Sequence, residues 1–322
     1  MDEQVISQNN FKDRQTGLII FGILIIMMGC LSGLVALLTL ALPLLPNLTG
    51  HELPPLRTML PGIFLYAALA VSFIWLGIGS ILCRRWARAL LLILSWFWLA
   101  TGFTTMISMI FMMPVLTAHQ PEFEKIPPTL RTFITLCSAV FQSIIYVIVP
   151  ASIAFFYKSP HVKATCEARD PVTRWTDACP LPVLSLSVFT IFSALMMAIM
   201  IPSLNGVVPL FGIYITGLPA VVIMLTMTVI YIFASRACYK LQLRGWWAAV
   251  IAYGLSTISC TITFAFSGVF RMYELMGLPA SQLVTLKEMN AIQTPIMWLG
   301  LVLFTLPLLA YFVFTKRYFK TS

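Results

Sequence analysis

Residues 178–235 read ACPLPVLSLSVFTIFSALMMAIMIPSLNGVVPLFGIYITGLPAVVIMLTMTVIYIFAS, and no Asp, Glu, Lys or Arg interrupts them. A helix that spans a bilayer needs about 20 apolar residues, so this stretch is too long for one span. The segment PSLNG at 202–206 has the composition of a turn, and it predicts a break there. The stretch therefore predicts two membrane-spanning helices, over 183–202 and 208–234.

Six further runs without charged residues each have room for one more helix. They are apolar on every face, whereas strands of a membrane barrel alternate apolar and polar residues over about 10 positions. Only 10% of the chain is charged, against about 25% in a typical soluble domain. The sequence therefore predicts an all-α fold, a polytopic transmembrane helical bundle of eight helices. The six other spans are expected over 17–43, 60–82, 88–113, 132–157, 246–270 and 291–314.

Lys and Arg are distributed unevenly between the two sides of this topology. Fifteen of the 20 fall on the side that holds both termini. Short loops rich in Lys and Arg stay in the cytoplasm, so both termini are expected there. The lipid bilayer is the expected partner of this basic face. Nucleic acid is not expected as a partner, because the charge is spread over several short turns and no binding module is present.

One of these basic turns carries a resemblance. The turn RRWAR at 84–88 resembles turns in small bacterial membrane proteins of unassigned function, and it implies no role for any residue. We expect the chain in the bacterial inner (plasma) membrane.

The two halves of the chain are weakly similar at an offset of 155 positions, which indicates a 4+4 parallel internal repeat. This offset pairs Thr101 with Ser256, Thr104 with Ser259, and Ser108 with Thr263. Such halves can hold a site on their common axis, or they can simply build a larger bundle. The predicted organisation is a cytoplasmic N-tail over 1–16, halves over 17–157 and 183–314, a cytoplasmic connector over 158–182 and a cytoplasmic C-tail over 315–322.

The interiors of the eight spans contain no ionisable Asp, Glu, Lys, Arg or His side chain. Intramembrane charges mark proton relays and voltage sensors, so both classes lose support. A stripe of hydroxyl groups remains, and it has two interpretations: hydrogen bonding between helices, or the lining of a cavity for a neutral or amphiphilic substrate. The amide of Gln142 needs a partner in the hydrocarbon, and one of these hydroxyls is expected to supply it. The stripe residues are Thr101, Thr104, Ser108, Ser256, Ser259 and Thr263.

Gly29 and Gly33 form a GxxxG pair in the first span. Such a pair allows two helix backbones to approach closely. Packing within the chain is the commoner use of this motif. A homodimer, or a membrane-protein partner, bound through Gly29 and Gly33 is the alternative.

The connector 158–182 holds the strongest metal candidates, His161, Cys166 and Cys179, with carboxylates nearby. Their spacing matches no common zinc pattern. The favoured interpretation is a structured connector whose charges pair locally, and no cofactor is expected. The loops on the other side carry His51 and His119, and a glycosylation sequon begins at Asn47.

The hypotheses for function follow from these features. Catalytic fingerprints are absent from the sequence, which favours a non-enzymatic structural, accessory or interaction protein of the membrane. The alternative is a transporter or flippase-like carrier of a neutral or amphiphilic small molecule, without an intramembrane proton relay. A membrane-embedded enzyme that uses His161 with Cys166 or Cys179, or else His51 with His119, is the third hypothesis.

Overall fold

The structure of this chain is a computed structural model, and it describes residues 12–42, 56–118, 126–204, 206–278, 283–284, 287, 301 and 305–319. The described residues form seven helical segments long and apolar enough to cross a membrane. Helices satisfy every backbone polar group within the segment, as hydrocarbon requires. These segments are α2 (Gln15–Ala41), α4 (Leu56–Ile81), α5 (Arg85–Ala118), the stretch α7–η3–α8 (Pro128–Lys158), α10 (Leu181–Ser203), α11 (Leu218–Tyr239) and α12 (Leu243–Ser267).

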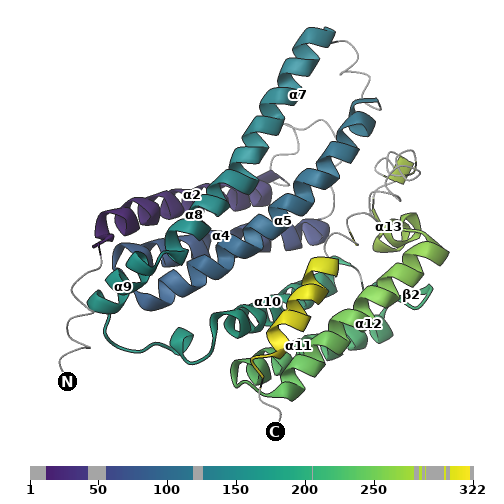
Figure 1. The fold of residues 1–322 in the computed structure, drawn as a ribbon. Coiled ribbons are helices and arrows are strands. Elements are labelled where there is room, and N and C mark those ends of the chain that lie inside the picture. Colours follow the sequence, from purple (N-terminus) through teal and green to yellow (C-terminus); the bar gives the residue numbers. More distant parts are fainter. Residues whose placement is uncertain are drawn as a thin grey trace. The chain divides into compact units, whose positions relative to one another are not determined.

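The all-α prediction and seven of the predicted spans agree with these helices (Figure 1). For the eighth span, the structure shows a shorter apolar helix over Thr305–Lys316, and most of the predicted range 291–314 lies outside the described residues. The boundary of the sixth span is wrong. Its helix α11 begins at Leu218, and the residues before it form a β-hairpin.

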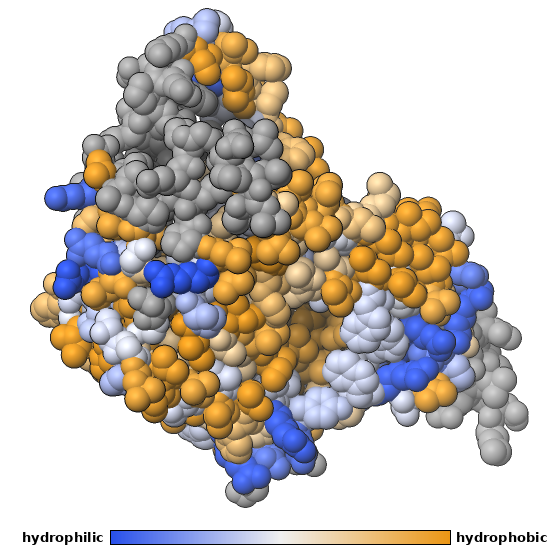
Figure 2. Space-filling model, turned by 180° about the vertical axis from the view of Figure 1, so that it is seen from behind, coloured by the Kyte–Doolittle hydropathy of each residue, from blue (hydrophilic) through white to orange (hydrophobic). Residues whose placement is uncertain are grey.

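Many large apolar side chains of these helices are exposed, and they cover much of the face shown in Figure 2. The exposed fraction is 72% for Phe155 and 83% for Phe266. In water a contiguous surface of this kind would be unfavourable, so it is suited to lipid.

The chain divides into two compact units. The first comprises the residues up to Leu31 with Ala70–Ala178, and the second comprises Ser32–Leu69 with the residues from Cys179 onward. The boundary after Ala178 falls within the predicted connector 158–182.

In the first unit, α2 packs against α4 through small residues. A Cβ atom built on Gly22 would lie 2.9 Å from the carbonyl oxygen of Gly77, and one on Gly77 would lie 2.8 Å from that of Gly22. The hydroxyl of Ser80 donates to the carbonyl of Leu18 at 2.9 Å, and it lies 2.5 Å from the hydroxyl of the buried Tyr157. Close backbone contact and paired hydroxyls therefore join α2, α4 and α8.

The helix from α7 to α8 contains one π-helical turn, η3 (Ile144–Ile148), within a continuous rod (Figure 1). Pro150 lacks the N–H group that a regular helix would donate to Tyr146. The N–H of Val149 bonds to the carbonyl of Ile144, five residues back. Gly102 on α5 faces this turn, and a Cβ atom there would clash with the carbonyl oxygen of Tyr146. The irregular turn therefore fits against a position that only glycine can occupy.

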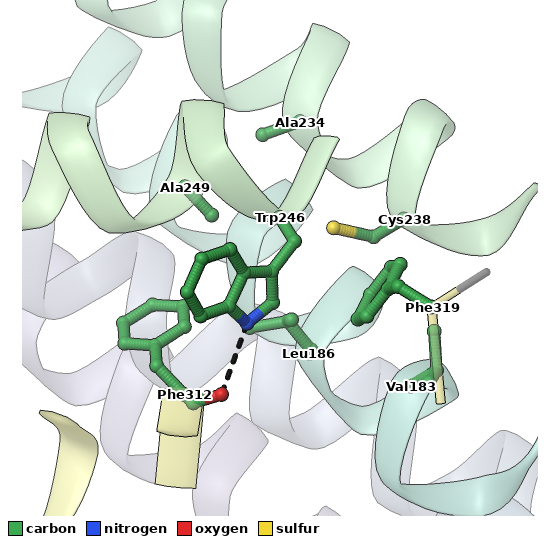
Figure 3. Close-up of a cluster of buried hydrophobic side chains, with 8 residues drawn as sticks. All are labelled: Val183, Leu186, Ala234, Cys238, Trp246, Ala249, Phe312 and Phe319. Carbon is green, nitrogen blue, oxygen red and sulfur yellow. Dashed lines mark hydrogen bonds between the residues drawn. The ribbon is translucent and has the colours of Figure 1, made fainter. Parts of the chain in front are cut away.

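The second unit has an apolar core built around Trp246 on α12 (Figure 3). The indole N–H of Trp246 donates to the carbonyl of Phe312 at 2.9 Å, which satisfies the buried ring nitrogen. This bond ties the short helix Thr305–Lys316 to α12. The other core residues are Val183 and Leu186 on α10, Ala234 and Cys238 on α11, Ala249 on α12, and Phe312 and Phe319.

A β-hairpin lies between α10 and α11. Its strands are β1 (Val208–Leu210) and β2 (Ile213–Ile215), paired antiparallel. The two turn residues, Phe211 and Gly212, have φ values of 42° and 104°. Positive φ at both positions is the geometry of a type I′ turn, which matches the twist of the strands. Phenylalanine is a strained choice there, since its Cβ disfavours positive φ. After α12, a short helix α13 (Phe270–Met276) follows.

The turns α4–α5 and α11–α12 have the same backbone geometry. Cys83 and Leu241 are non-glycine residues with φ values of 54° and 58°. Cys83 N–H donates to the Ser80 carbonyl at 2.9 Å, and Leu241 N–H donates to the Cys238 carbonyl at 2.8 Å. These two turn positions differ by 158 (83 and 241), whereas the predicted repeat has an offset of 155. The two offsets differ by three residues, which is nearly one helical turn. Both therefore align apolar positions of one helix with apolar positions of the other.

Candidate functional site

The hydroxyl stripe on α12 binds the backbone of the β-hairpin. Ser259 Oγ accepts a hydrogen bond from the N–H of Phe211 at 3.0 Å and donates to the carbonyl of Pro209 at 3.0 Å. Thr263 Oγ1 accepts from the N–H of Gly212 at 3.0 Å and donates to the carbonyl of Ser259 at 2.8 Å. Both side chains are buried. Each hydroxyl therefore uses its donor and its acceptor within the chain.

Two more bonds hold the hairpin to the end of α12. Ser267 Oγ donates to the carbonyl of Gly212, and the hydroxyl of Tyr214 donates to the carbonyl of Gly268 at 2.7 Å. Ser256, one turn before Ser259, is half-buried. The hydroxyl stripe on α12 therefore forms hydrogen bonds within the chain. Its main partner is the β-hairpin, whereas the sequence suggested another helix.

The stripe on α5 has a different environment. Thr101 is exposed, and its hydroxyl donates to the carbonyl of Phe97 at 2.9 Å. The hydroxyl of Thr104 donates to the carbonyl of Ala100 at 3.0 Å, and Ser108 is half-buried. Threonine side chains that bond within their own helix tolerate lipid well. The two stripes belong to different units.

Gln142 has a partner other than the predicted one. Its amide nitrogen lies 3.4 Å from Ser138 Oγ on the same helix. Arg131, Thr135, Ser138 and Gln142 are spaced at i, i+4, i+7 and i+11, so they share one face of α7, and all four are half-buried. Apart from the half-buried Ser143, the rest of α7 is exposed, including Phe133, Leu136 and Phe141. The sequence shows this polar face, but the prediction considered Gln142 alone.

Asp170 is the centre of a charged cluster in the connector, with 2% of its side chain exposed. Arg174 donates to its two oxygens, from Nη2 at 2.8 Å and from Nε at 3.2 Å. Arg84 Nη1 lies 3.5 Å from the carboxylate, and the backbone N–H of Arg85 donates to it at 3.3 Å. The hydrogen bond from Arg174 holds the pKa of Asp170 below its usual value.

The other acids of the connector also pair with basic residues. Arg85 lies 3.5 Å from Glu167 and 3.3 Å from Asp177. Arg169 lies 3.2 Å from Asp13, before α2. The predicted local pairing is present at Asp170 and Arg174, but most of these ion pairs join the connector to the turn at Arg84 and Arg85 or to the N-terminal segment. The connector, which includes α9 (Pro160–Arg169) and η4 (Trp175–Asp177), is therefore tied to the first unit.

The three metal candidates do not form a metal site in the part of the chain that the structure describes, which holds no group of three or more His, Cys, Asp or Glu suited to one ion. Burial raises the pKa of the Cys166 thiol to about 12 and that of the Cys179 thiol to about 11. A thiol binds zinc as the thiolate, and the burial of both groups disfavours that charged form. The carbonyl of His161 accepts a hydrogen bond from the hydroxyl of Thr165, one turn later in α9, at 2.9 Å.

Gly29 packs within the chain. A Cβ atom built on it would lie 3.0 Å from the backbone nitrogen of Ile74 and 3.1 Å from the carbonyl oxygen of Ala70, both on α4. Gly29 therefore makes the close helix contact within the chain that is the commoner use of a GxxxG pair. Gly33 is half-buried, and a dimer or partner contact through Gly29 and Gly33 stays a prediction. His51, His119 and the sequon at Asn47 lie outside the described residues.

Two groups of residues emerged only from the structure. The hairpin tip was missed because its apolar side chains extend the hydropathy of the neighbouring span. The available signal was the alternation of Pro209, Gly212 and Gly217 with β-branched and aromatic residues. The importance of Asp170 was also missed, because its basic partners Arg84 and Arg85 are distant in sequence.

Comparisons with protein-family models, with curated proteins and with solved structures found no match to this chain. The described helices, with their length and apolar surface, are those of an α-helical membrane protein.

Proposed function

We propose that this chain is a multi-pass integral membrane protein with a non-enzymatic structural, accessory or interaction role. The observation that carries the proposal is the use of the span hydroxyls. Ser259 and Thr263 bond to the hairpin, and Thr101 and Thr104 bond to their own helix. Ser259 and Thr263 use both donor and acceptor within the chain, and Thr101 and Thr104 use their donors within α5, so few hydroxyl donors remain for a substrate.

The proposed location is the bacterial inner membrane, with both termini in the cytoplasm. The excess of Lys and Arg on one side supports this orientation. A phosphatase or green fluorescent protein fused after Lys158 or after Ser322 reports the side. Fluorescence without phosphatase activity at both positions is expected, and phosphatase activity at either would contradict the topology.

We include the parallel repeat in this proposal, in the 158 register. The same register that superposes the two turns pairs Thr101 with Ser259 and Thr105 with Thr263. Thr105 donates to the carbonyl of Thr101 at 2.9 Å, just as Thr263 donates to that of Ser259 at 2.8 Å. A shared local bonding pattern supports a common origin for α5 and α12.

The interaction role is tested by crosslinking in cells. A photoreactive phenylalanine analogue replaces Phe133 or Phe141 on α7, whose described side chains are half-buried at most. A discrete protein adduct from α7 is expected, because a helix that packs so little within its chain is available to a partner. The matched control is Phe155 on α8, which is 72% exposed. Lipid adducts alone at all three positions would contradict an interaction through α7.

A carrier of a neutral or amphiphilic molecule is the second candidate. The half-buried polar face of α7, from Arg131 to Gln142, favours it, because polar groups along a membrane helix can line a path. Purified chain in vesicles that speeds the transbilayer movement of a fluorescent phosphatidylcholine would support this candidate against the accessory role. Gln142→Leu should then abolish the effect, and Thr226→Val, which alters an exposed hydroxyl bonded within α11, should leave it intact.

A further inference from the structure

The β-hairpin 208–215 contains no charged side chain, and its tip is apolar and exposed. The exposed fraction is 52% for Phe211 and 62% for Ile213. The neighbouring residues Leu218 on α11 and Phe266 on α12 are exposed to 76% and 83%. The tip therefore continues the apolar surface of the two helices beside it.

The depth of the hairpin follows from α12. The exposed Trp247 lies near one end of this helix, and the ammonium group of Lys316 lies 5.5 Å from its ring centroid. Tryptophan and lysine mark a membrane interface. At 1.5 Å per residue, Ser259 and Thr263 lie about 18 and 24 Å along the helix from Trp247. Both positions fall inside a hydrocarbon core about 30 Å thick.

The opposite interface lies beyond the hairpin. After Gly268 the chain becomes charged again, where Arg271 pairs with Glu274 at 2.8 Å on α13. The backbone groups that bond to Ser259 and Thr263 are therefore placed on the hydrocarbon side of this charged segment. A tilt of α12 from the membrane normal would move these backbone groups away from the interface at α13 and toward the middle of the bilayer.

Hydrocarbon offers no hydrogen-bond partners, so irregular backbone at membrane depth needs protein groups to satisfy its N–H and carbonyl groups. The tip meets this condition through α12. The N–H groups of Phe211 and Gly212 and the carbonyls of Pro209 and Gly212 all bond to hydroxyls of Ser259, Thr263 or Ser267. The side chains of Phe211 and Ile213 then remain free to face acyl chains.

We propose that residues 208–215 form a re-entrant hairpin that lies in the leaflet farther from Lys316, with Phe211 and Ile213 in contact with lipid acyl chains. The hydroxyls of α12 replace water as hydrogen-bond partners of the tip. The strained φ of Phe211 fits this role. Asn or Gly would relieve the strain at this turn position, but neither has an apolar ring that could contact lipid.

The first test uses the unaltered chain in nanodiscs of phosphatidylcholine whose acyl chains carry a diazirine. After illumination, mass spectrometry should find lipid adducts on Phe211 or Ile213 as well as on Phe266. Adducts on Phe266 without any on residues 208–215 would overturn the proposal.

The second test measures access of water to the tip. In nanodiscs both faces are open to a membrane-impermeant maleimide, and peptide mass spectrometry distinguishes each cysteine. Phe211→Cys should react at least about ten-fold more slowly than Glu274→Cys, because a thiol in hydrocarbon rarely ionises. Equal rates at the two positions would contradict a lipid location.

A third measurement leaves Phe211 in place. The amides of Phe211 and Gly212 should be protected from hydrogen–deuterium exchange in the wild type. Ser259→Ala combined with Thr263→Val should remove most of this protection, and Thr226→Val should not change it. Unchanged protection in the double variant would show that α12 does not hold the tip. None of these readouts depends on the cellular role of the chain.

Discussion

At the scale of single residues, glycines at close helix contacts decide the packing of the first unit. Gly102→Ala would place a methyl group against the carbonyl oxygen of Tyr146. We expect a loss of about 1–3 kcal/mol of unfolding free energy, typical of overpacking, measured as a lower melting temperature in detergent. Gly254→Ala is the control, because a Cβ atom there meets nothing within 4 Å. An equal loss in both variants would show that helix propensity or general disturbance is responsible.

Asp170 gives a prediction about pH. Its pKa is lowered in the folded chain, so its ionised form stabilises the fold above the ordinary carboxyl pKa of about 3.9. This contribution is lost as the pH falls through the lowered value. Asp170→Asn should cost about 1–3 kcal/mol at pH 7, since Arg174 loses a charged partner. The difference in melting temperature between wild type and variant should shrink between pH 5 and pH 2.

The control for Asp170 is an exposed ion pair. Glu274→Gln breaks a pair whose side chains are 59% and 39% exposed, and such pairs contribute about 0–1 kcal/mol. A larger effect at Glu274 than at Asp170 would refute the assignment of Asp170 as the centre of the cluster.

At the scale of elements, the turns α4–α5 and α11–α12 both bring a glycine close to an alanine of the neighbouring helix. The glycine lies before the turn in α4–α5 and after it in α11–α12. A Cβ atom on Gly79 would lie 2.6 Å from that of Ala87, and one on Gly245 would lie 2.6 Å from that of Ala237. Gly245→Ala should therefore destabilise the second unit by about 1–3 kcal/mol.

The same pair allows a rescue experiment. Adding Ala237→Gly to Gly245→Ala removes the contact between the two methyl groups and should recover part of the lost melting temperature, while the contact with the backbone nitrogen of Cys238 at 2.6 Å remains. A double variant no more stable than Gly245→Ala would indicate that the two turns are not interchangeable. Circular dichroism during heating in detergent gives both values.

At the scale of the whole molecule, the exposed apolar surface predicts retention in lipid. Membranes washed with carbonate at pH 11 should keep the chain in the pellet, because hydrophobic burial does not depend on ionic contacts. A peripheral protein held by its basic face would be released. Recovery of folded chain in the supernatant would contradict a transmembrane location.

Much of this fold could be predicted from the sequence, because hydropathy and length identify a membrane helix. The hairpin was harder to predict, since Phe211 and Ile213 are as apolar as a membrane helix and only Pro209, Gly212 and Gly217 signal a turn or strand there. Its hydrogen bonds to Ser259 and Thr263 needed the fold. The two similar turns differ by 158 positions and the predicted repeat by 155; hydropathy does not distinguish these offsets, because a helix presents similar residues after three or four positions. The cluster around Asp170 needed the fold, since Arg84 and Arg85 are far away in sequence.

The bonds between the hairpin and α12 have a consequence for biosynthesis. Ser259 and Thr263 follow the amides that they bind by 48 and 51 residues. When α10 and α11 first leave the ribosome and enter the bilayer, the backbone of the tip has no partner in the nascent chain. Until α12 arrives, water, lipid headgroups or an insertion factor must shelter those groups. Translation arrested before Leu243 should therefore leave this loop open to protease, and synthesis through Ser267 should close it.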